Sequence, residues 1–253
     1  MRTLHETNLI FRRAMRLSLR NPIWVILGLI QPILYLTMFG PLLENMTRVQ
    51  GWQTGDAWQV FVPGLLVQLG IFGAAFVGFG LVAEMRAGVV ERMRVTPASR
   101  LALLLGRVLR DVVVLLVQGV ILVACAELFG LDAPLAGLVL GLLVVAALGA
   151  AFSSASYAAA LMLKSEDALA PLANGLAVPL LLLSGILLPM SLAPGWLEAI
   201  SDANPVKHVV DGVRALFHEG SVTMTVVWGV VATLGLVAAG LALGTRTFER
   251  ESG

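Results

Sequence analysis

Charged residues are scarce in this sequence. Asp, Glu, Lys and Arg make up only 13% of its 253 residues, whereas hydrophobic residues make up 58% and the mean hydropathy is +0.90. A soluble globule of this size cannot hide so much apolar surface from water, which excludes an ordinary soluble domain. The net charge of +1 provides no overall positive field, so nucleic acid is not an expected partner.

Cysteine, lysine and the common catalytic motifs are also rare or missing. Cys125 is the only cysteine, so an intrachain disulfide is excluded. The sequence has no Gly-x-Ser-x-Gly turn and no His-Glu-x-x-His metal helix, which argues against an intramembrane enzyme. Neither Lys164 nor Lys207 follows a glycine, so there is no phosphate-binding Gly-x-x-x-x-Gly-Lys loop. We therefore predict no catalytic residue, no metal ligand and no cofactor in this chain.

Long apolar stretches are abundant. Six of them reach, or nearly reach, the roughly 20 residues that a helix needs to cross a bilayer. They lack the strict alternation of outer-membrane barrel strands. The sequence predicts an all-α integral membrane protein, a single transmembrane domain over residues 1–253. Its six expected transmembrane helices are Ile23–Leu43, Phe61–Ala83, Val112–Phe129, Ala136–Leu163, Ala168–Leu188 and Met224–Leu243.

Positive charge is distributed unevenly between the two sides of the expected bundle. With six spans, both termini share one side with residues 84–111 and 164–167, and this side carries 14 of the 17 Lys and Arg residues. The positive-inside rule then predicts that both termini are cytoplasmic.

The first 21 residues predict an amphipathic helix at the cytoplasmic interface. Arg12, Arg16 and Arg20 recur every four residues, while Ile10, Ala14 and Leu17 lie on another face. A cleaved signal peptide is the alternative, but the apolar run starts late and contains Gln31-Pro32.

The spans contain polar and small residues but no ionisable residue near their middle. This absence argues against a carrier driven by protons or sodium and favours an apolar or amphiphilic cargo. Ala147, Ala151, Ala155 and Ala159 predict close packing of the fourth span against another helix of the same chain. Five residues are candidates for a substrate path, with packing or interhelical hydrogen bonding as the alternative: Gln31, Gln68, Phe72, Phe76 and Asn174.

Two segments outside the spans predict further helices. Residues 84–96, EMRAGVVERMRVT, have a helical apolar repeat, and Thr96-Pro97 ends this helix and starts the next. Contact with anionic lipid and docking onto a partner protein both fit this charged segment. In ANPVKHVVDGVRALF, Asn204-Pro205 supplies a helix start and Gly220 a stop. This second helix is expected to lie on the outer face or to dip into it.

The order of these pieces resembles the permease subunits of ABC-2 type exporters, especially the drug-export branch typified by daunorubicin-resistance permeases. The resemblance covers essentially the whole chain. It is carried by EMRAGVVERMRVTPASR, above all residues 91–100, and by LLLSGILLPMSLAPGWLEAISDANPVKHVVDGVRALF. The most specific positions of the second stretch are Ser184-Gly185, Pro189, Pro194, Trp196, Asn204-Pro205 and Arg214.

The resemblance implies a transport subunit in a bacterial cytoplasmic membrane, surrounded by lipid and paired with a second copy or a close homologue. Two separate ATPase subunits, which bind ATP and magnesium, would drive export of hydrophobic or amphiphilic drugs, antibiotics or lipids. A polysaccharide or glycolipid exporter, and a membrane sensor or assembly subunit that moves no cargo, stay open as alternatives.

The resemblance also assigns roles to particular residues. It implies that residues 84–100 form the cytoplasmic coupling loop, seated on the ATPase through Glu84, Arg86, Glu91, Arg92, Arg94 and Pro97. It implies that residues 189–222 form an extracellular gate that includes Pro189, Trp196, Asn204, Pro205 and Arg214. Cargo is expected to pass between two permeases along the first, second and fifth spans.

Overall fold

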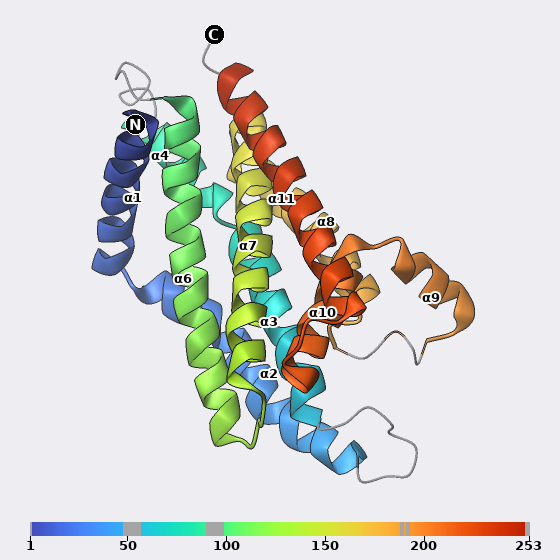
Figure 1. Ribbon diagram of the computed structural model, residues 1–253. Helices are drawn as coiled ribbons and strands as arrows, with labels where there is room; N and C mark the ends of the chain where they lie inside the picture. The colour runs from blue at the N-terminus through green and yellow to red at the C-terminus, as the bar shows by residue number, and fades with distance from the viewer. Residues whose placement is uncertain (1, 48–56, 90–98, 188–189, 191–192, 251–253) are drawn as a thin grey trace.

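The computed structural model describes residues 2–47, 57–89, 99–187, 190 and 193–250, and the regular structure among them is helical (Figure 1). The longer helices are α2 (Ile23–Thr47), α3 (Ala57–Ala75), α6 (Arg100–Leu128), α7 (Leu135–Leu163), α8 (Glu166–Leu183) and α11 (Met224–Arg250). The other helices are α1 (Arg2–Arg20), α4 (Gly78–Arg86), α9 (Gly195–Asp202) and α10 (Pro205–Glu219).

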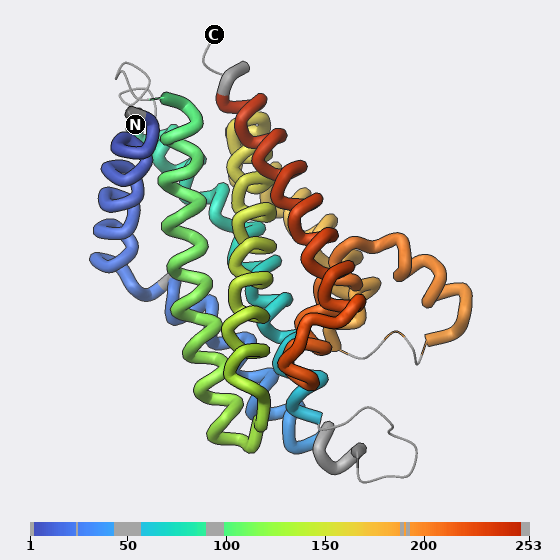
Figure 2. Tube along the Cα trace, in the orientation of Figure 1, coloured from blue at the N-terminus to red at the C-terminus, as the bar shows by residue number. Residues whose placement is uncertain are grey.

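Six stretches of these helices are long and apolar enough to cross a membrane, which confirms the predicted all-α protein with six candidate spans. They are Val25–Leu42, Ala57–Arg86, Arg100–Leu128, Leu135–Leu163, Glu166–Leu183 and Met224–Phe248. The two ends of the described chain lie at the same end of the bundle, as an even number of spans requires (Figure 2).

Helix α7 lies at the centre of the bundle and packs against α3, α6, α10 and α11. Its small residues allow close approach: a Cβ added at Gly240 of α11 would lie 2.4 Å from the carbonyl oxygen of Ala151. The predicted packing of the small-residue row against another helix of the same chain is therefore confirmed at Ala151.

The second span is interrupted, although the sequence predicted one continuous helix over Phe61–Ala83. Helix α3 ends at Ala75 and α4 begins at Gly78. The Ser156 hydroxyl of α7 accepts a hydrogen bond from the Gly78 N–H (3.0 Å) and donates one to the Ala75 carbonyl (2.6 Å). A neighbouring helix thus satisfies backbone groups that the interruption frees, which makes the break tolerable inside a membrane.

Helix α1 runs beside the first turns of α6, in the same direction (Figure 1). Contact is close, because a Cβ at Gly106 would lie 2.7 Å from the Ile10 side chain. The arginines at 12, 16 and 20 are exposed, as an amphipathic helix requires. Leu17, predicted to share the apolar face with Ile10 and Ala14, is 50% exposed, so α6 does not cover this side chain.

Two predicted helix boundaries, near the end of the bundle that holds both termini, are wrong. Helix α4 ends at Arg86 and Gly88 has a φ of 66°, so a single helix over 84–96 does not begin at Glu84. Helix α6 begins at Arg100, where the Ser99 hydroxyl accepts a hydrogen bond from the Ala102 N–H (3.2 Å), rather than at Thr96-Pro97.

Helix α10 dips into the bundle instead of lying on its surface. Five apolar side chains on its inner side belong to the main core with exposed fractions of zero: Val206, Val209, Val210, Val213 and Phe217. The helix packs against α3, α7 and α11, whereas α9 projects away from the bundle (Figure 2). Of the two placements that the sequence left open, the structure shows the buried one.

Candidate coupling and gating sites

The end of α4 and the start of α6 flank the predicted coupling segment. Glu84, on the last turn of α4, forms an ion pair of 2.5 Å with Arg107 of α6. Arg86 lies 3.3 Å from Glu166, in the first turn of α8, where a carboxylate also favours the helix N-terminus. The other four residues predicted to dock onto the ATPase, Glu91, Arg92, Arg94 and Pro97, lie outside the described residues.

A buried polar cluster that was not predicted from the sequence adjoins this ion pair. The Tyr157 hydroxyl of α7 donates a hydrogen bond to Asp111 of α6 (2.6 Å). Arg110 lies 3.0 Å from Asp111 and also donates to the Tyr157 oxygen (3.2 Å) and to Ser18 of α1 (3.3 Å). The available signal was a carboxylate and a tyrosine towards the same end of neighbouring spans, because such groups must find partners in protein.

The predicted gate residue Arg214 connects three segments towards the end of the bundle opposite the termini, which is the outer end in the predicted topology. Its guanidinium donates hydrogen bonds to the carbonyls of Val60 (3.0 Å), Gly185 (2.7 Å) and Ile186 (3.2 Å). Gly185 has a φ of 72°, which lets the chain turn after α8 and direct these carbonyls at the arginine. Arg214 therefore fastens α10 to the outer ends of α3 and α8.

Burial shifts the pKa values of Arg214 and of the neighbouring Asp211. Arg214 is deeply buried, which lowers its pKa to about 10, yet the guanidinium stays charged at neutral pH. Burial likewise raises the pKa of the Asp211 carboxyl above its usual value, although Arg214 opposes the shift. The two side chains are 3.9 Å apart, so the short contacts of Arg214 are with backbone carbonyls.

Asn204 and Pro205 start α10, as predicted. The Asn204 side chain accepts a hydrogen bond from the Val206 N–H (3.0 Å) and donates one to the Leu180 carbonyl of α8 (3.2 Å). Trp196 lies apart from them on α9 and is 66% exposed, and Pro189 lies outside the described residues. The structure thus unites Asn204, Pro205 and Arg214 on α10 and leaves Trp196 on the periphery.

The five predicted path residues do not surround one space within the chain. Gln68 and Phe72 lie on α3 and Phe76 lies in the break that follows it, and the Phe72 and Phe76 rings are 6.3 Å apart. Gln68 is 2% exposed, and its side-chain oxygen finds no hydrogen-bond donor among the described residues. Gln31 of α2 and Asn174 of α8 are exposed on the outside of the single chain.

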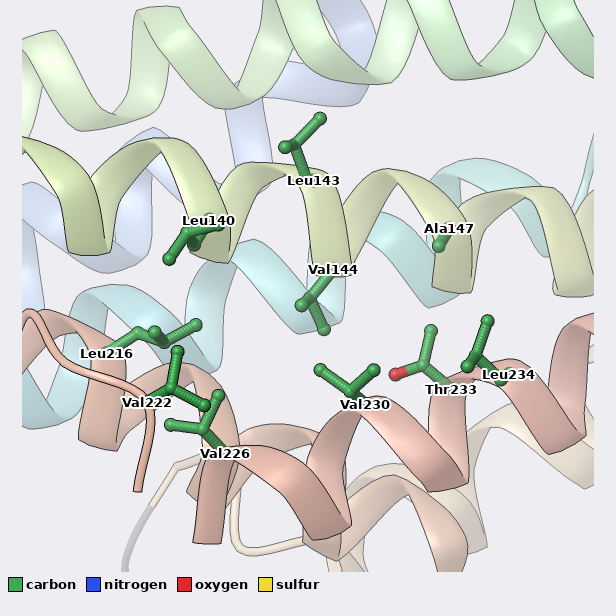
Figure 3. A pocket seen from close by; sticks show the side chains of 10 residues that line it. All are labelled: Leu140, Leu143, Val144, Ala147, Leu216, Val222, Val226, Val230, Thr233 and Leu234. Carbon is green, nitrogen blue, oxygen red and sulfur yellow. The ribbon is translucent and has the colours of Figure 1, made fainter. Parts of the chain in front are cut away.

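An apolar cavity of about 260 Å³ lies elsewhere, between α7, α10 and α11 (Figure 3). Its wall contains one polar side chain, Thr233, whose hydroxyl donates to the Gly229 carbonyl (2.8 Å). None of the predicted path residues lines this cavity. The full lining is Leu140, Leu143, Val144, Ala147, Leu216, Val222, Val226, Val230, Thr233 and Leu234.

Comparison with known proteins agrees with this architecture. Residues 5–218 match the sequence model of the family described as ABC-2 type transporter. The chain is 27% identical to the daunorubicin resistance ABC transporter permease protein DrrB1 of Streptomyces coeruleorubidus, over 95% of this chain and 84% of that protein. It is 25% identical to the probable doxorubicin resistance ABC transporter permease protein DrrC of Mycobacterium tuberculosis, over 96% and 88%. It is also 27% identical to the putative transport permease ycf38 of Cyanophora paradoxa, over 80% and 70%.

Proposed function

The chain belongs to the ABC-2 type transporter family, as a membrane permease subunit without a nucleotide-binding domain, and from this premise we propose that it exports hydrophobic or amphiphilic drugs, antibiotics or lipids. The observation that supports this cargo class is the similarity, over nearly its whole length, to permeases named for resistance to daunorubicin and doxorubicin. The spans as predicted from the sequence also lack ionisable residues near their middle, which suits an uncharged or amphiphilic molecule better than an ion.

A separate ATPase supplies the energy in this proposal. Two permeases pair with two ATPase subunits, which bind ATP and magnesium, and both termini face the cytoplasm of a bacterial cell. Segment 84–100 receives the ATPase. At the start of this segment, Glu84 is ion-paired to α6 and Arg86 is ion-paired to α8. The concentration of 14 of the 17 Lys and Arg residues on the side that holds both termini supports this orientation.

The second permease covers helices that are largely exposed in a single chain. Only 11% of the spanning residues of α8 and 22% of those of α2 are buried within the chain. Gln31 and Asn174 lie on these faces, so a path between two permeases can include them together with residues of α3. Residues 189–222, anchored by Arg214, close this path on the outer side.

Export and ATP hydrolysis can be measured together in liposomes that contain the permease and its ABC ATPase. Doxorubicin and daunorubicin serve as fluorescent probes, and an oligosaccharide lipid represents the alternative cargo. We expect the two drugs to stimulate hydrolysis and to be transported. If the ATPase binds and only the oligosaccharide lipid stimulates it, the polysaccharide or glycolipid alternative replaces the drug proposal. If no ATPase binds, the chain is a sensor or assembly subunit.

Substitutions in the coupling loop test where the ATPase pushes. Glu91→Gln and Arg92→Gln are expected to lower export per ATP hydrolysed about tenfold, because they weaken coupling between the two sites by about 1.4 kcal/mol. The matched control is Arg246→Gln, which removes an exposed arginine at the same end of the bundle. Normal export by both loop variants, with the ATPase still bound, would show that this loop does not couple the subunits.

A further inference from the structure

The break in the second span makes α4 a separate short lever that ends at the coupling loop. On one side α4 is hydrogen-bonded through Gly78 to Ser156 of α7, at 3.0 Å. On the other side Glu84 is paired at 2.5 Å with Arg107, whose side chain is only 10% exposed. A displacement of the coupling loop therefore reaches α6 and α7 through directed polar contacts with small exposed area, whereas the contact of α4 with α8 is the more exposed ion pair of Arg86 with Glu166.

The Arg110–Asp111–Tyr157 cluster then joins α6 to α7. Asp111 accepts hydrogen bonds from Tyr157, and Arg110 bridges the same tyrosine to Ser18 of α1. Tyr157 is 1% exposed and Asp111 is 9% exposed, so water offers neither group a substitute partner. Buried charged groups that lose their partners are costly, and this cost keeps α1, α6 and α7 together as one unit.

The opposite end of α7 presses directly on the re-entrant helix α10. A Cβ at Gly137 would lie 1.9 Å from the Leu216 carbonyl oxygen, and one at Gly141 would lie 2.7 Å from the Phe217 ring. Close-packed backbones of this kind transmit displacement because no soft side chain lies between them. Arg214 of α10 continues the chain of contacts to the ends of α3 and α8.

Helix α8 is much less suited to this task. Only Leu169 and Ala177 are buried along it, and Pro171 and Pro179 interrupt its backbone hydrogen bonding. Within one chain it contacts α3, α4 and α7 at few places, among them the ion pair of Glu166 with Arg86, whereas α7 packs against most of the bundle. Helix α8 therefore has fewer packed contacts in its own chain through which it could push α10 than α7 has.

We infer that α7 is the rigid element that transmits motion from the coupling loop to the outer gate, and that Glu84–Arg107 and Asp111–Tyr157 are the positioning pairs that connect it to the loop. This inference rests on the proposed function as an ATP-driven exporter. It assigns roles to Arg107, Asp111 and Tyr157, which neither the family match nor the predicted coupling residues single out.

The test follows motion at both ends of the complex with its ABC ATPase in nanodiscs. Cys125→Ser removes the native thiol. Spin labels on cysteines introduced at chosen positions then report the distance within one pair of positions at each end of the bundle. Ala87 and Leu243 report movement of α4 at the cytoplasmic end. Leu128 and Ile200, 88% and 50% exposed, report movement of the outer segment. Distances are compared between the nucleotide-free complex and the complex trapped with ADP and vanadate.

We expect the trapped wild type to change at both pairs of positions. In Glu84→Gln and in Tyr157→Phe the cytoplasmic change persists, the outer change is lost, and export of doxorubicin per ATP falls about tenfold. The double exchange Glu84→Arg with Arg107→Glu restores the outer change, because it rebuilds the pair with its charges reversed. Arg246→Gln is the control and behaves as wild type.

Three results separate the possible failures. An outer change that survives in both Glu84→Gln and Tyr157→Phe, with only thermal stability lowered, overturns the inference and leaves the exporter intact. Failure of the charge-reversed pair to recover any outer change also overturns it, provided that this variant still binds the ATPase. If the wild type shows no nucleotide-dependent change and no export, the proposed function fails, and the inference fails with it.

Discussion

The two ends of the bundle hold their helices together in different ways. At the end that holds both termini, the more buried contacts pair side chains with side chains: Glu84 with Arg107, and Asp111 with Arg110 and Tyr157. At the opposite end, the buried Arg214 binds the backbone carbonyls of three residues and its nearest carboxylate is 3.9 Å away, while the side-chain pair of His218 and Gln59 is exposed.

This difference indicates which end can rearrange during transport. Pairs of side chains can exchange partners through rotamer changes, and reversed charges can replace them. Carbonyls are fixed to the backbone, so the three segments keep their relative positions for as long as Arg214 binds all of them. The outer end is thus expected to move as a block, with α10 and the ends of α3 and α8 together, whereas at the other end α4 can adjust against the unit of α1, α6 and α7.

The largest effect in this comparison is expected from removing the outer anchor. Arg214→Met leaves three buried carbonyls without their donor, which lowers the free energy of unfolding by about 3 kcal/mol. Thermal unfolding of the purified permease measures this loss. Arg214→Lys is the matched control: it keeps the charge and recovers part of the stability, since an ammonium cannot serve all three carbonyls. A Met variant as stable as the wild type would refute the anchoring role.

A smaller effect is expected where α7 meets α10. In Gly137→Ala the added methyl group collides with the Leu216 carbonyl, so the two helices must separate, at a cost of about 2 kcal/mol. Gly235→Ala on α11 is the control, because nothing lies within 4 Å of its added Cβ. Thermal unfolding and export are measured for both variants. Equal stability and equal export of the two variants would show that α7 and α10 can separate at little cost, and would remove the contrast between the ends.

The smallest effect is expected from Asp211→Asn, as a change in how stability depends on pH. Burial raises the pKa of this carboxyl, so the folded protein holds the proton more tightly than the unfolded chain does. Ionisation therefore costs stability as the pH rises from about 4 towards 7, and Asp211→Asn removes this cost. Unfolding temperatures across this range should fall for wild type relative to the variant. The change is modest because the carboxylate is 38% exposed.

The Asp211 measurement also sharpens the comparison between the ends. If Arg214 is held by carbonyls, Asp211→Asn leaves export unchanged at neutral pH. A loss of export as large as that of Arg214→Met would mean that the outer end, too, depends on a pair of side chains.

Local features of the fold were predictable from the sequence because they depend on neighbours along the chain. The apolar runs predicted six spans, and Asn204-Pro205 and Gly220 predicted the start and end of α10, all of which the structure confirms. The break after Ala75 was not predictable, since its compensation comes from Ser156, far away in sequence. The burial of α10 was equally undetermined, because a valine-rich face suits a membrane surface as well as a protein core.

The sequence by itself determined the class of this protein: a membrane protein with six candidate spans, an ABC-2 permease, with its charge concentrated at a few segments. Only the tertiary structure decided which charges meet. Arg214 and Val60 are 154 positions apart, and Tyr157 and Asp111 are 46 apart. Periodicity specifies which face of a helix is apolar, but the rotation and depth of each helix against its neighbours decide which polar groups come within hydrogen-bonding distance. Those two quantities arise from packing, which no single segment encodes.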